Sequence, residues 1–346
     1  MMLSLVFALL AGAPTDPATA QAPVKVVTSL TTYAAIAREL VGEQGTVSSI
    51  ALGDEDPHFV QPKPSFVTLL RNADLFVTTG LDLELWVPAL LDRAGNRKVT
   101  EGGPGYVTAY TGINLMEVPA GAVSRSAGDI HIGGNPHIHT DPVNAIIISR
   151  NILVGLRRVA PAQAAYFTGR QQDFERRVLE ALIGADLVRI LTPPTAFNLL
   201  NSNQLDGFLG RTMLEGKPLA TRLGGWLKKA DVLRGMSMTC YHKEWAYFTR
   251  RFGIECIAFI EAKPGIPPTP GHVQEVIALM RDRKVPALFA SNYFSRSQIS
   301  QVAERTGATA VVVPENTDGA PGVAVSYTHL RAHETKANLV CRLLLE

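Results

Sequence analysis

The chain has 346 residues, of which 46% are hydrophobic and 18% are charged, and its formal net charge is +2. This length allows two packed lobes. No basic run and no interleaving of basic with aromatic residues occurs, which argues against nucleic acid as a partner.

Residues 1–22 have the features of an export signal. The apolar segment from Met2 to Ala11 is too short to cross a bilayer as a helix, and Ala20-Gln21-Ala22 supplies the small residues of a cleavage site. The usual basic residues before the apolar segment are missing, and no cysteine near the cleavage point could carry a lipid anchor. Beyond residue 22, no uninterrupted apolar run approaches the ~20 residues of a transmembrane helix. We therefore predict a soluble, exported protein.

Strands and helices alternate over residues 23–158, which we predict to form the first lobe. Strands are expected at residues 24–29, 46–52 and 75–79, and helices at 31–41, 62–72 and 83–93. Alternation at this spacing is typical of parallel β/α units. His58 follows the second expected strand, at the edge where open parallel sheets bind ligands. Residues 106–135 are expected to be irregular.

The segment from residue 135 to 142 carries the strongest local signal. Asp141 followed by a proline is typical of a helix N-terminus, and an apolar helical run extends to about residue 159. Pro136 favours extended backbone before it, so His137 lies on a stiff loop that leads into this helix. A single loop histidine is more often bonded to nearby backbone than to a metal. Its interpretation as a ligand therefore depends on the other loops.

The second half of the chain repeats the pattern after a connector. Residues 159–187 are expected to form a long, solvated helix between the lobes, because polar side chains are frequent at 171–177. Residues 188–324 are predicted to form the second lobe. They begin with an irregular insert at 188–230 of no assigned function, followed by strands at 234–240, 256–260, 287–290 and 309–313. The predicted fold class is α/β, with two lobes of mostly parallel sheets joined by one long connecting helix.

The three cysteines have no CxxC spacing, so neither a zinc ribbon nor a thioredoxin-type site is expected. Cys240 and Cys256 follow two apolar segments and could meet across neighbouring strands. Free buried thiols are an alternative of at least equal weight.

His58, His137 and His242 share one property, because each lies just after a strand or before a helix, at the edge expected to face the cleft between the lobes. Three imidazoles suit a borderline-soft divalent metal such as zinc, with Zn–N distances of about 2.0–2.1 Å. A carboxylate from residues 315–319, after the last strand, could be the fourth ligand. Since Mn²⁺ prefers oxygen-rich sites, this set predicts tighter binding of zinc.

Four short motifs occur in the order found in one known family: Asp56-Pro57-His58 with Pro62 and Ser65, Asn135-Pro136-His137 with Asp141-Pro142, Tyr241-His242-Lys243 with Trp245, and the segment from Lys263 to Pro268. On these motifs, residues 23–324 resemble the metal-binding substrate-binding proteins of bacterial ABC importers for zinc and manganese, which have the TroA-like fold. Together the motifs are specific, because they keep their order over most of the chain.

The resemblance implies metal ligands at His58, His137 and His242. The fourth ligand of the family, often an acid near the last strand, falls at Asp318 in this chain, with Glu315 as the alternative. The resemblance also implies Zn²⁺ as the bound metal with Mn²⁺ as the alternative, a periplasmic location, a membrane permease as partner, and a monomer.

The chain departs from the family pattern in several places. His139 stands where many relatives have an aromatic residue. It therefore either lines the site or only takes the place of that aromatic side chain in the packing. The long histidine-rich loop of some zinc-binding relatives is absent, and we expect His131 to be a solvated loop residue and His272 to lie at the surface. Residues 325–346 lack the family's terminal helix and resemble translated sequencing-adapter DNA. We predict a non-native tail there, with an ordinary amphipathic helix as the alternative.

The leading hypothesis is an exported receptor, not an enzyme, that binds Zn²⁺ or Mn²⁺ between its lobes and delivers it to an ABC importer. The alternative is a zinc metallohydrolase that uses the same histidines. It would need an open coordination position and a general base, and the sequence has no HExxH motif. Nor does it have a P-loop or a GxGxxG motif, so nucleotide chemistry is not indicated. A binder of organic ligands would need an aromatic-lined cleft, whereas aromatic residues form 7% of the chain and do not cluster.

Overall fold

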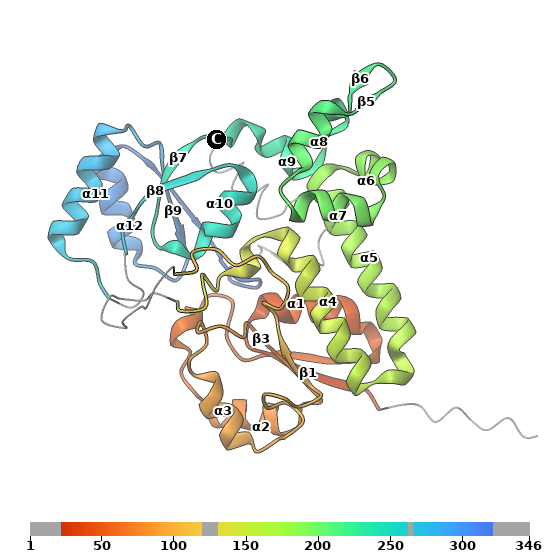
Figure 1. Cartoon of the computed structure of the whole chain (residues 1–346). Coiled ribbons are helices and arrows are strands. Elements are labelled where there is room, and N and C mark those ends of the chain that lie inside the picture. Colours follow the sequence, from red (N-terminus) through yellow and green to blue (C-terminus); the bar gives the residue numbers. More distant parts are fainter. Residues whose placement is uncertain (1–21, 120–130, 262–265, 321–346) are drawn as a thin grey trace, which may run out of the picture.

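The computed structural model describes residues 22–119, 131–261 and 266–320. The predicted export signal up to residue 21 and the predicted tail at 325–346 lie outside the described residues. Two parallel four-stranded sheets form the centres of two lobes, the first below and the second at the upper left in Figure 1. The predicted α/β fold with two parallel-sheet lobes is therefore confirmed.

The first lobe contains a parallel sheet in the order β2-β1-β3-β4. Its strands are β1 (Val24–Thr28), β2 (Gly45–Ser49), β3 (Leu75–Thr78) and β4 (Tyr106–Thr108). Its helices are α1 (Thr31–Val41), α2 (Pro64–Arg71), α3 (Val87–Ala94) and α4 (Pro142–Val159). Strand β4 corrects the expectation of irregular chain over 106–135, because a three-residue edge strand is too short to show a periodic pattern.

Helix α4 lies directly against this sheet because it carries a glycine at the point of closest approach. A Cβ atom on Gly155 would lie 2.4 Å from Val107 Cγ2 and 2.7 Å from Leu75 Cδ1, closer than real Cβ atoms come. The N-terminus of α4 is fixed as the sequence predicts, with Asp141 as its cap and Pro142 as its first residue. The loop that carries His137 therefore enters a helix whose position is set by the sheet.

The second lobe contains a parallel sheet in the order β10-β9-β7-β8. Its strands are β7 (Ser237–Cys240), β8 (Glu255–Phe259), β9 (Ala287–Ser291) and β10 (Thr309–Val313). Its helices are α10 (Ala246–Phe252), α11 (Pro270–Asp282) and α12 (Arg296–Thr306). All five residues of β9 are buried, as expected for a central strand of a parallel sheet.

The long helix within the predicted connector is the 20-residue α5 (Ala164–Ile183), which runs up the right-hand side of Figure 1 toward α6 and α7. The prediction of a solvated helix is wrong for its inner face. Gln171 and Glu175 are buried there, and Gln171 Nε2 donates to Ser149 Oγ on α4 at 3.1 Å. Arg150, also on α4, donates to both carboxylate oxygens of Glu175. Polar residues on α5 thus fasten the connector to the first lobe.

The segment 188–230 is helical, which corrects the prediction of an irregular insert. It forms most of a small helical unit made of α6 (Ala185–Leu191), α7 (Pro193–Asn201), α8 (Leu205–Arg211), the hairpin β5–β6 (Met213–Leu214 and Lys217–Pro218) and α9 (Gly225–Lys229). Each helix is too short to show a clear period, and frequent glycines suggested loops. Tertiary packing supplies the missing stability, because Leu187, Leu200 and Leu209 join the same apolar core as the first lobe.

Short 3₁₀ turns complete the described chain: Gly42–Gln44, Pro57–Phe59, Ile138–Thr140, Pro161–Gln163, Leu219–Arg222, Ala230–Leu233 and Lys243–Trp245. Three of these turns lie next to the histidines discussed below. None of the helices in the described part of the chain has the length and apolarity that a membrane span requires.

A buried ion pair joins the two lobes. Arg251 of α10 donates from Nε to Asp141 Oδ1 at 3.0 Å and from Nη2 to Asp141 Oδ2 at 2.9 Å. The same carboxylate accepts the backbone N–H of Val143 at 2.9 Å, and Arg251 Nη1 donates to the carbonyl of Leu200 at 2.9 Å. Asp141 is fully buried, and both charges have their partners, which is the condition under which a buried pair is tolerated.

Cys240 and Cys256 form a disulfide between the neighbouring strands β7 and β8, with a Cα–Cα distance of 5.6 Å. The sequence left this pairing open against free thiols. The structure therefore decides for the disulfide, which also agrees with the predicted export of the chain.

We predict that removing this disulfide destabilises the chain by about 3 kcal/mol, the chain-entropy value for a closed loop of about 15 residues. The variant is Cys240→Ala with Cys256→Ala, compared with the parent protein by denaturant unfolding under oxidising conditions. Cys341→Ala is the control, because it removes a cysteine that is not part of the bond. Equal stability of the parent protein with and without reductant would contradict the disulfide.

Candidate metal centre

His58 is held on a short turn between the second strand of the first lobe and α2. Asp56 caps this turn by accepting the backbone N–H of His58 at 3.0 Å, and the same oxygen, Oδ1, lies 2.9 Å from His58 Nδ1. Trp86 Nε1 donates to the carbonyl of Pro57 at 2.9 Å. The turn is thus fixed from both sides, and one ring nitrogen of His58 is committed to Asp56.

His137 is fully buried on the loop that leads to α4. Asn135 Oδ1 accepts both the backbone N–H of His137 and its Nδ1–H, each at 3.0 Å. The amide nitrogen of Asn135 donates to the carbonyl of Lys243 in the second lobe at 3.0 Å. One asparagine therefore orients His137 and ties its loop to the loop that carries His242.

His242 follows β7 directly, at the carboxyl end of that strand. Its Nδ1 donates to the carbonyl of Glu261 at 3.2 Å, and the residue is 3% exposed. Glu261 follows β8, so the ring is held by the neighbouring strand of the same sheet.

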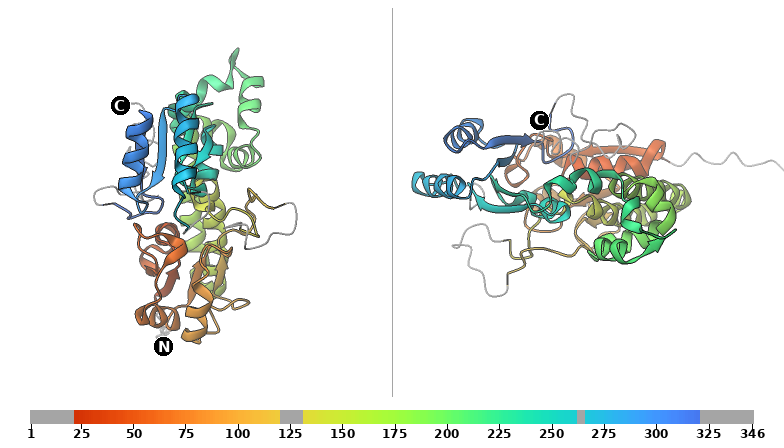
Figure 2. Two further views of the ribbon diagram at one scale, coloured as in Figure 1. Left: turned by 90° about the vertical axis from the view of Figure 1, so that its left-hand side faces the viewer. Right: turned by 90° about the horizontal axis from the view of Figure 1, so that it is seen from above.

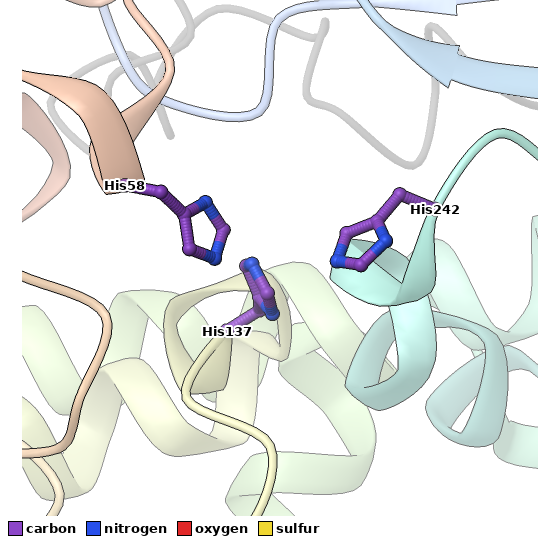
Figure 3. A group of neighbouring side chains, drawn as sticks. All are labelled: His58, His137 and His242. Carbon is purple, nitrogen blue, oxygen red and sulfur yellow. The ribbon is translucent and has the colours of Figure 1, made fainter. Parts of the chain in front are cut away.

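The three histidines converge, and in Figure 3 their rings lie close together, facing a common space. One donor atom from each lies within 4.8 Å of the others, and the ring centroids are 5.2 Å (His58–His137), 5.8 Å (His137–His242) and 6.2 Å (His58–His242) apart. Because each Nδ1 faces an oxygen acceptor, it carries the proton, and Nε2 keeps its lone pair for a metal. Donor atoms bound to one zinc ion lie roughly 3.3 Å apart in a tetrahedron, so a small contraction closes the site.

Electrostatics keep the central imidazole neutral. Burial lowers the pKa of His137 well below its ordinary value, and the neighbouring imidazoles of His58, His242 and His131 lower it further. A protonated ring could not coordinate a metal, so a depressed pKa is the state that metal binding requires. Within the described residues, Nε2 of His137 has no hydrogen-bond partner and is shielded from solvent.

Neither candidate acid belongs to the group of donor atoms that lie within 4.8 Å of one another. Asp318 has a side chain that is 57% exposed, and its carboxylate faces Arg38 at 3.9 Å. In this arrangement, the carboxylate of Asp318 is therefore not among the converging donor atoms. Glu315 is fully buried but is engaged elsewhere, with its Oε1 3.1 Å from His139 Nε2 and its Oε2 accepting the hydroxyl of Tyr293.

The sequence matches the family described as "Zinc-uptake complex component A periplasmic" over residues 26–183 and 226–337. The chain belongs to this family. The match leaves out residues 184–225, which correspond to α6, α7, α8 and the β5–β6 hairpin. The match also continues beyond residue 325, into the segment for which we predict a non-native tail.

Individual relatives agree with this assignment. The "Iron-binding protein YfeA" of Yersinia pestis is 24% identical over 320 residues, which cover 92% of this chain and 86% of that protein. The "Zinc-binding lipoprotein AdcA" of Streptococcus pneumoniae is 25% identical over 240 residues, which cover 64% of this chain. This chain spans only 46% of the length of AdcA.

Two solved structures share the fold of this chain. A crystal structure of ZnuA superposes with a TM-score of 0.63 at 17% sequence identity. The superposition covers 92% of this chain and 98% of the ZnuA chain. The Mn-bound periplasmic metal-binding protein from Candidatus Liberibacter asiaticus has a TM-score of 0.62 at 18% identity, with the same coverage.

Three further histidines have environments that the sequence did not settle. His139 is buried, pairs with Glu315 and packs edge-on against Tyr33, with ring centroids 6.0 Å apart, so it links the lobes beside the metal site. The prediction of a solvated His131 is wrong, because this residue is 9% exposed and its ring stacks on His58. His272 is the third residue of α11, with a side chain that is 35% exposed, and it lies outside the donor group.

Sequence reasoning missed His131 and also Glu244. His131 contacts Asp82, which follows β3. Ligand-binding residues gather after the carboxyl ends of parallel strands, the rule by which His58 was found, and the same rule would have drawn attention to Asp82. Glu244 is fully buried two residues after His242, and Ser291 Oγ donates to its Oε1 at 3.1 Å. Burial raises the pKa of Glu244 well above its ordinary value, and the nearby carboxylate of Glu315 raises it further.

We predict that Glu244→Gln makes the metal-free protein more stable at pH 7. The pKa of Glu244 is raised in the folded state, so this group favours folding while it is protonated. That contribution is lost as pH rises above about 4.3, the ordinary glutamate value in the unfolded chain. Glutamine imitates the protonated form and still accepts from Ser291. Denaturant unfolding is measured at pH 4 and pH 7 with chelator present. The free energy of unfolding of Glu244→Gln should exceed that of the parent protein at pH 7, and this difference should shrink toward pH 4.

The matched control is Glu304→Gln on α12, which makes the same substitution at an exposed position. It should leave stability unchanged within about 0.5 kcal/mol at both pH values. A loss of stability at pH 7 in Glu244→Gln would contradict the assigned direction of the pKa.

Proposed function

We propose that this chain is an extracytoplasmic receptor that binds a divalent transition-metal ion, zinc in first place, and delivers it to the permease of an ABC importer. His58, His137 and His242 are the proposed protein ligands. The metal is cargo in this proposal, and the chain performs no chemical reaction on it.

The observation that carries the proposal is the convergence of three imidazoles from three separate loops. Each has Nδ1 held by an oxygen of its own surroundings, which leaves Nε2 as the coordinating atom. His58 and His137 come from the first lobe and His242 from the second. A metal bound to all three therefore bridges the lobes, and any movement that separates the lobes would weaken its binding.

The names of relatives support a transition metal as cargo. YfeA is named an iron-binding protein, AdcA a zinc-binding lipoprotein, and a solved relative contains manganese. Within this range, an imidazole-rich site favours zinc, because Mn²⁺ prefers carboxylate and carbonyl oxygens and stands lowest in the general affinity order. We therefore propose Zn²⁺ as the preferred metal and Mn²⁺ as a weaker alternative.

The remaining features of the proposal follow from family membership. The permease, the periplasmic location and the cleavage of residues 1–22 are proposed together, since a receptor for an importer must be exported. We also propose a monomer with lobes at 23–158 and 188–324 and the connector at 159–187. The hydrolase alternative has no observation in its favour, and the family is defined by zinc uptake.

We predict that the protein binds Zn²⁺ more tightly than Mn²⁺ and that His137→Ala weakens zinc binding more than 100-fold. Residues that only orient a ligand already contribute about 10–100-fold, and His137 is itself the proposed ligand. The measurement is a competitive titration with a chromophoric chelator. His272→Ala is the control, because it removes an imidazole that lies outside the donor group. Unchanged zinc affinity in His137→Ala would exclude His137 from the site.

The same titration should show a fall in affinity as pH drops through about 6, because protons compete for imidazole nitrogens whose ordinary pKa is about 6.5. His137 contributes little to this competition, since burial holds its pKa well below that value. Tighter binding of manganese than of zinc at pH 7 would reverse the proposed preference.

We also propose that residues 325–346 are not needed for folding or metal binding. A chain that ends at residue 324 should unfold at the same denaturant concentration as the full chain and bind zinc equally well. A loss of either property would show that the tail is native, as the extension of the family match to residue 337 would suggest.

A further inference from the structure

We propose that His131, positioned by Asp82, is the fourth nitrogen donor to the captured metal and sets the preference for zinc. This inference rests on the proposed function, since it names an additional residue of the same site. It differs from the family expectation, in which an acid near the last strand completes the site.

The first observation is that His131 is built like the three other ligands. Its Nδ1 lies 2.8 Å from Asp82 Oδ1, just as His58 Nδ1 lies 2.9 Å from Asp56 Oδ1. Its side chain is 9% exposed, and its Nε2 is shielded from solvent like those of the other ligands. A carboxylate on Nδ1 fixes the tautomer and raises the basicity of Nε2, the usual arrangement for a metal-binding imidazole.

The second observation is the distance between rings. In a tetrahedral site, each ring centroid would lie about 3.2 Å from the metal, and two centroids about 5.2 Å from each other. The ring centroid of His131 lies 5.7 Å from that of His58 and 6.0 Å from that of His137. The accepted member His242 lies at 6.2 Å and 5.8 Å from the same two rings. By ring position, His131 and His242 are therefore equivalent neighbours of the His58–His137 pair.

His131 is not one of the three residues whose donor atoms all lie within 4.8 Å of one another. A bound metal would therefore have to draw its ring inward. The centroid distances of His131 from His58 and His137 exceed the tetrahedral value of about 5.2 Å by margins similar to those of His242 from the same two rings.

The backbone holds His131 at this place. A turn closes from the N–H of Gly134 to the carbonyl of His131 at 3.0 Å, and Asn135 N–H then donates to the carbonyl of Met116 at 2.8 Å. A Cβ on Gly133 would lie 3.0 Å from Leu81 Cδ2, so the turn packs closely against the residue before Asp82. Gly134 has a φ of +101°, which favours glycine. The turn thus fixes His131 relative to both Asp82 and the Asn135–His137 loop.

The acids that could compete for the fourth position are less well placed. Asp318 is exposed and faces Arg38, and Glu315 is engaged by His139 and Tyr293. Replacing an acid by a fourth imidazole makes the donor set softer, which favours zinc and disfavours manganese. His131 is therefore assigned a role in metal choice as well as in affinity.

The test is a comparison of His131→Ala, Asp82→Asn, Glu315→Gln and His137→Ala by competitive titration with Zn²⁺ and Mn²⁺. His131→Ala should lower zinc affinity by at least tenfold and manganese affinity by less, so that the ratio of the two affinities falls. Asp82→Asn should lower zinc affinity by about 10–100-fold, as expected for loss of the group that orients a ligand. His272→Ala controls for removal of an imidazole, and denaturant unfolding of each metal-free variant controls for folding.

Visible absorption of the Co²⁺-loaded proteins gives a second measurement that is independent of affinity. The bands of four-coordinate Co²⁺ should change in His131→Ala and remain unchanged in Glu315→Gln. A folded His131→Ala variant that keeps both its zinc affinity within threefold and its Co²⁺ spectrum would overturn the role of His131. If that variant and His137→Ala both bind like the parent protein, the proposed function itself fails, so the two failures are distinguishable.

Discussion

The proposed metal centre depends on the side chain of Asn135, which makes hydrogen bonds to both lobes. Its carbonyl oxygen holds the backbone and the ring of His137, while its amide nitrogen donates to the carbonyl of Lys243, next to His242. The backbone carbonyl of Asn135 also accepts the hydroxyl of Tyr247 at 2.7 Å. The separation of His137 and His242 is therefore set by one buried residue, although the two histidines belong to different lobes.

Other contacts determine how the lobes could move around this point. On the α10 side, the buried pair of Asp141 and Arg251 joins the start of α4 to the second lobe. On another side, Thr32 Oγ1 at the start of α1 donates to Asn316 Oδ1 at 3.0 Å, and Thr31 donates to the carbonyl of Thr317. The threonine contacts are neutral and the ion pair is charged and buried. If the lobes separated, the threonine contacts would break more easily than the ion pair, because breaking the ion pair leaves buried charges without partners.

The site concentrates polar groups that are costly to bury. Glu244, Glu315, His137 and His139 are all fully or almost fully buried between the lobes. Glu244 is held with a raised pKa and His137 with a lowered one, so at neutral pH the metal-free site suppresses charge on both groups. A divalent cation would supply positive charge at this place and lower the cost of ionising the nearby carboxylates. Metal binding and the stability of the closed lobes are thus expected to be coupled.

The sequence by itself indicated most strands and helices of the two sheet-containing lobes and singled out the three histidines. Asp141 with Pro142 predicted the start of α4, and the alternation of strands and helices predicted two parallel sheets, because these signals depend on neighbouring residues. The rule that ligands gather at strand ends placed His58 and His242 in one site. It could not separate Asp318 from Glu315, which stand three residues apart. Only the packed chain shows that Glu315 turns inward to His139, while Asp318 turns outward to Arg38. Tertiary structure likewise decided the disulfide, the helical insert and the burial of His131, because each depends on residues distant in sequence.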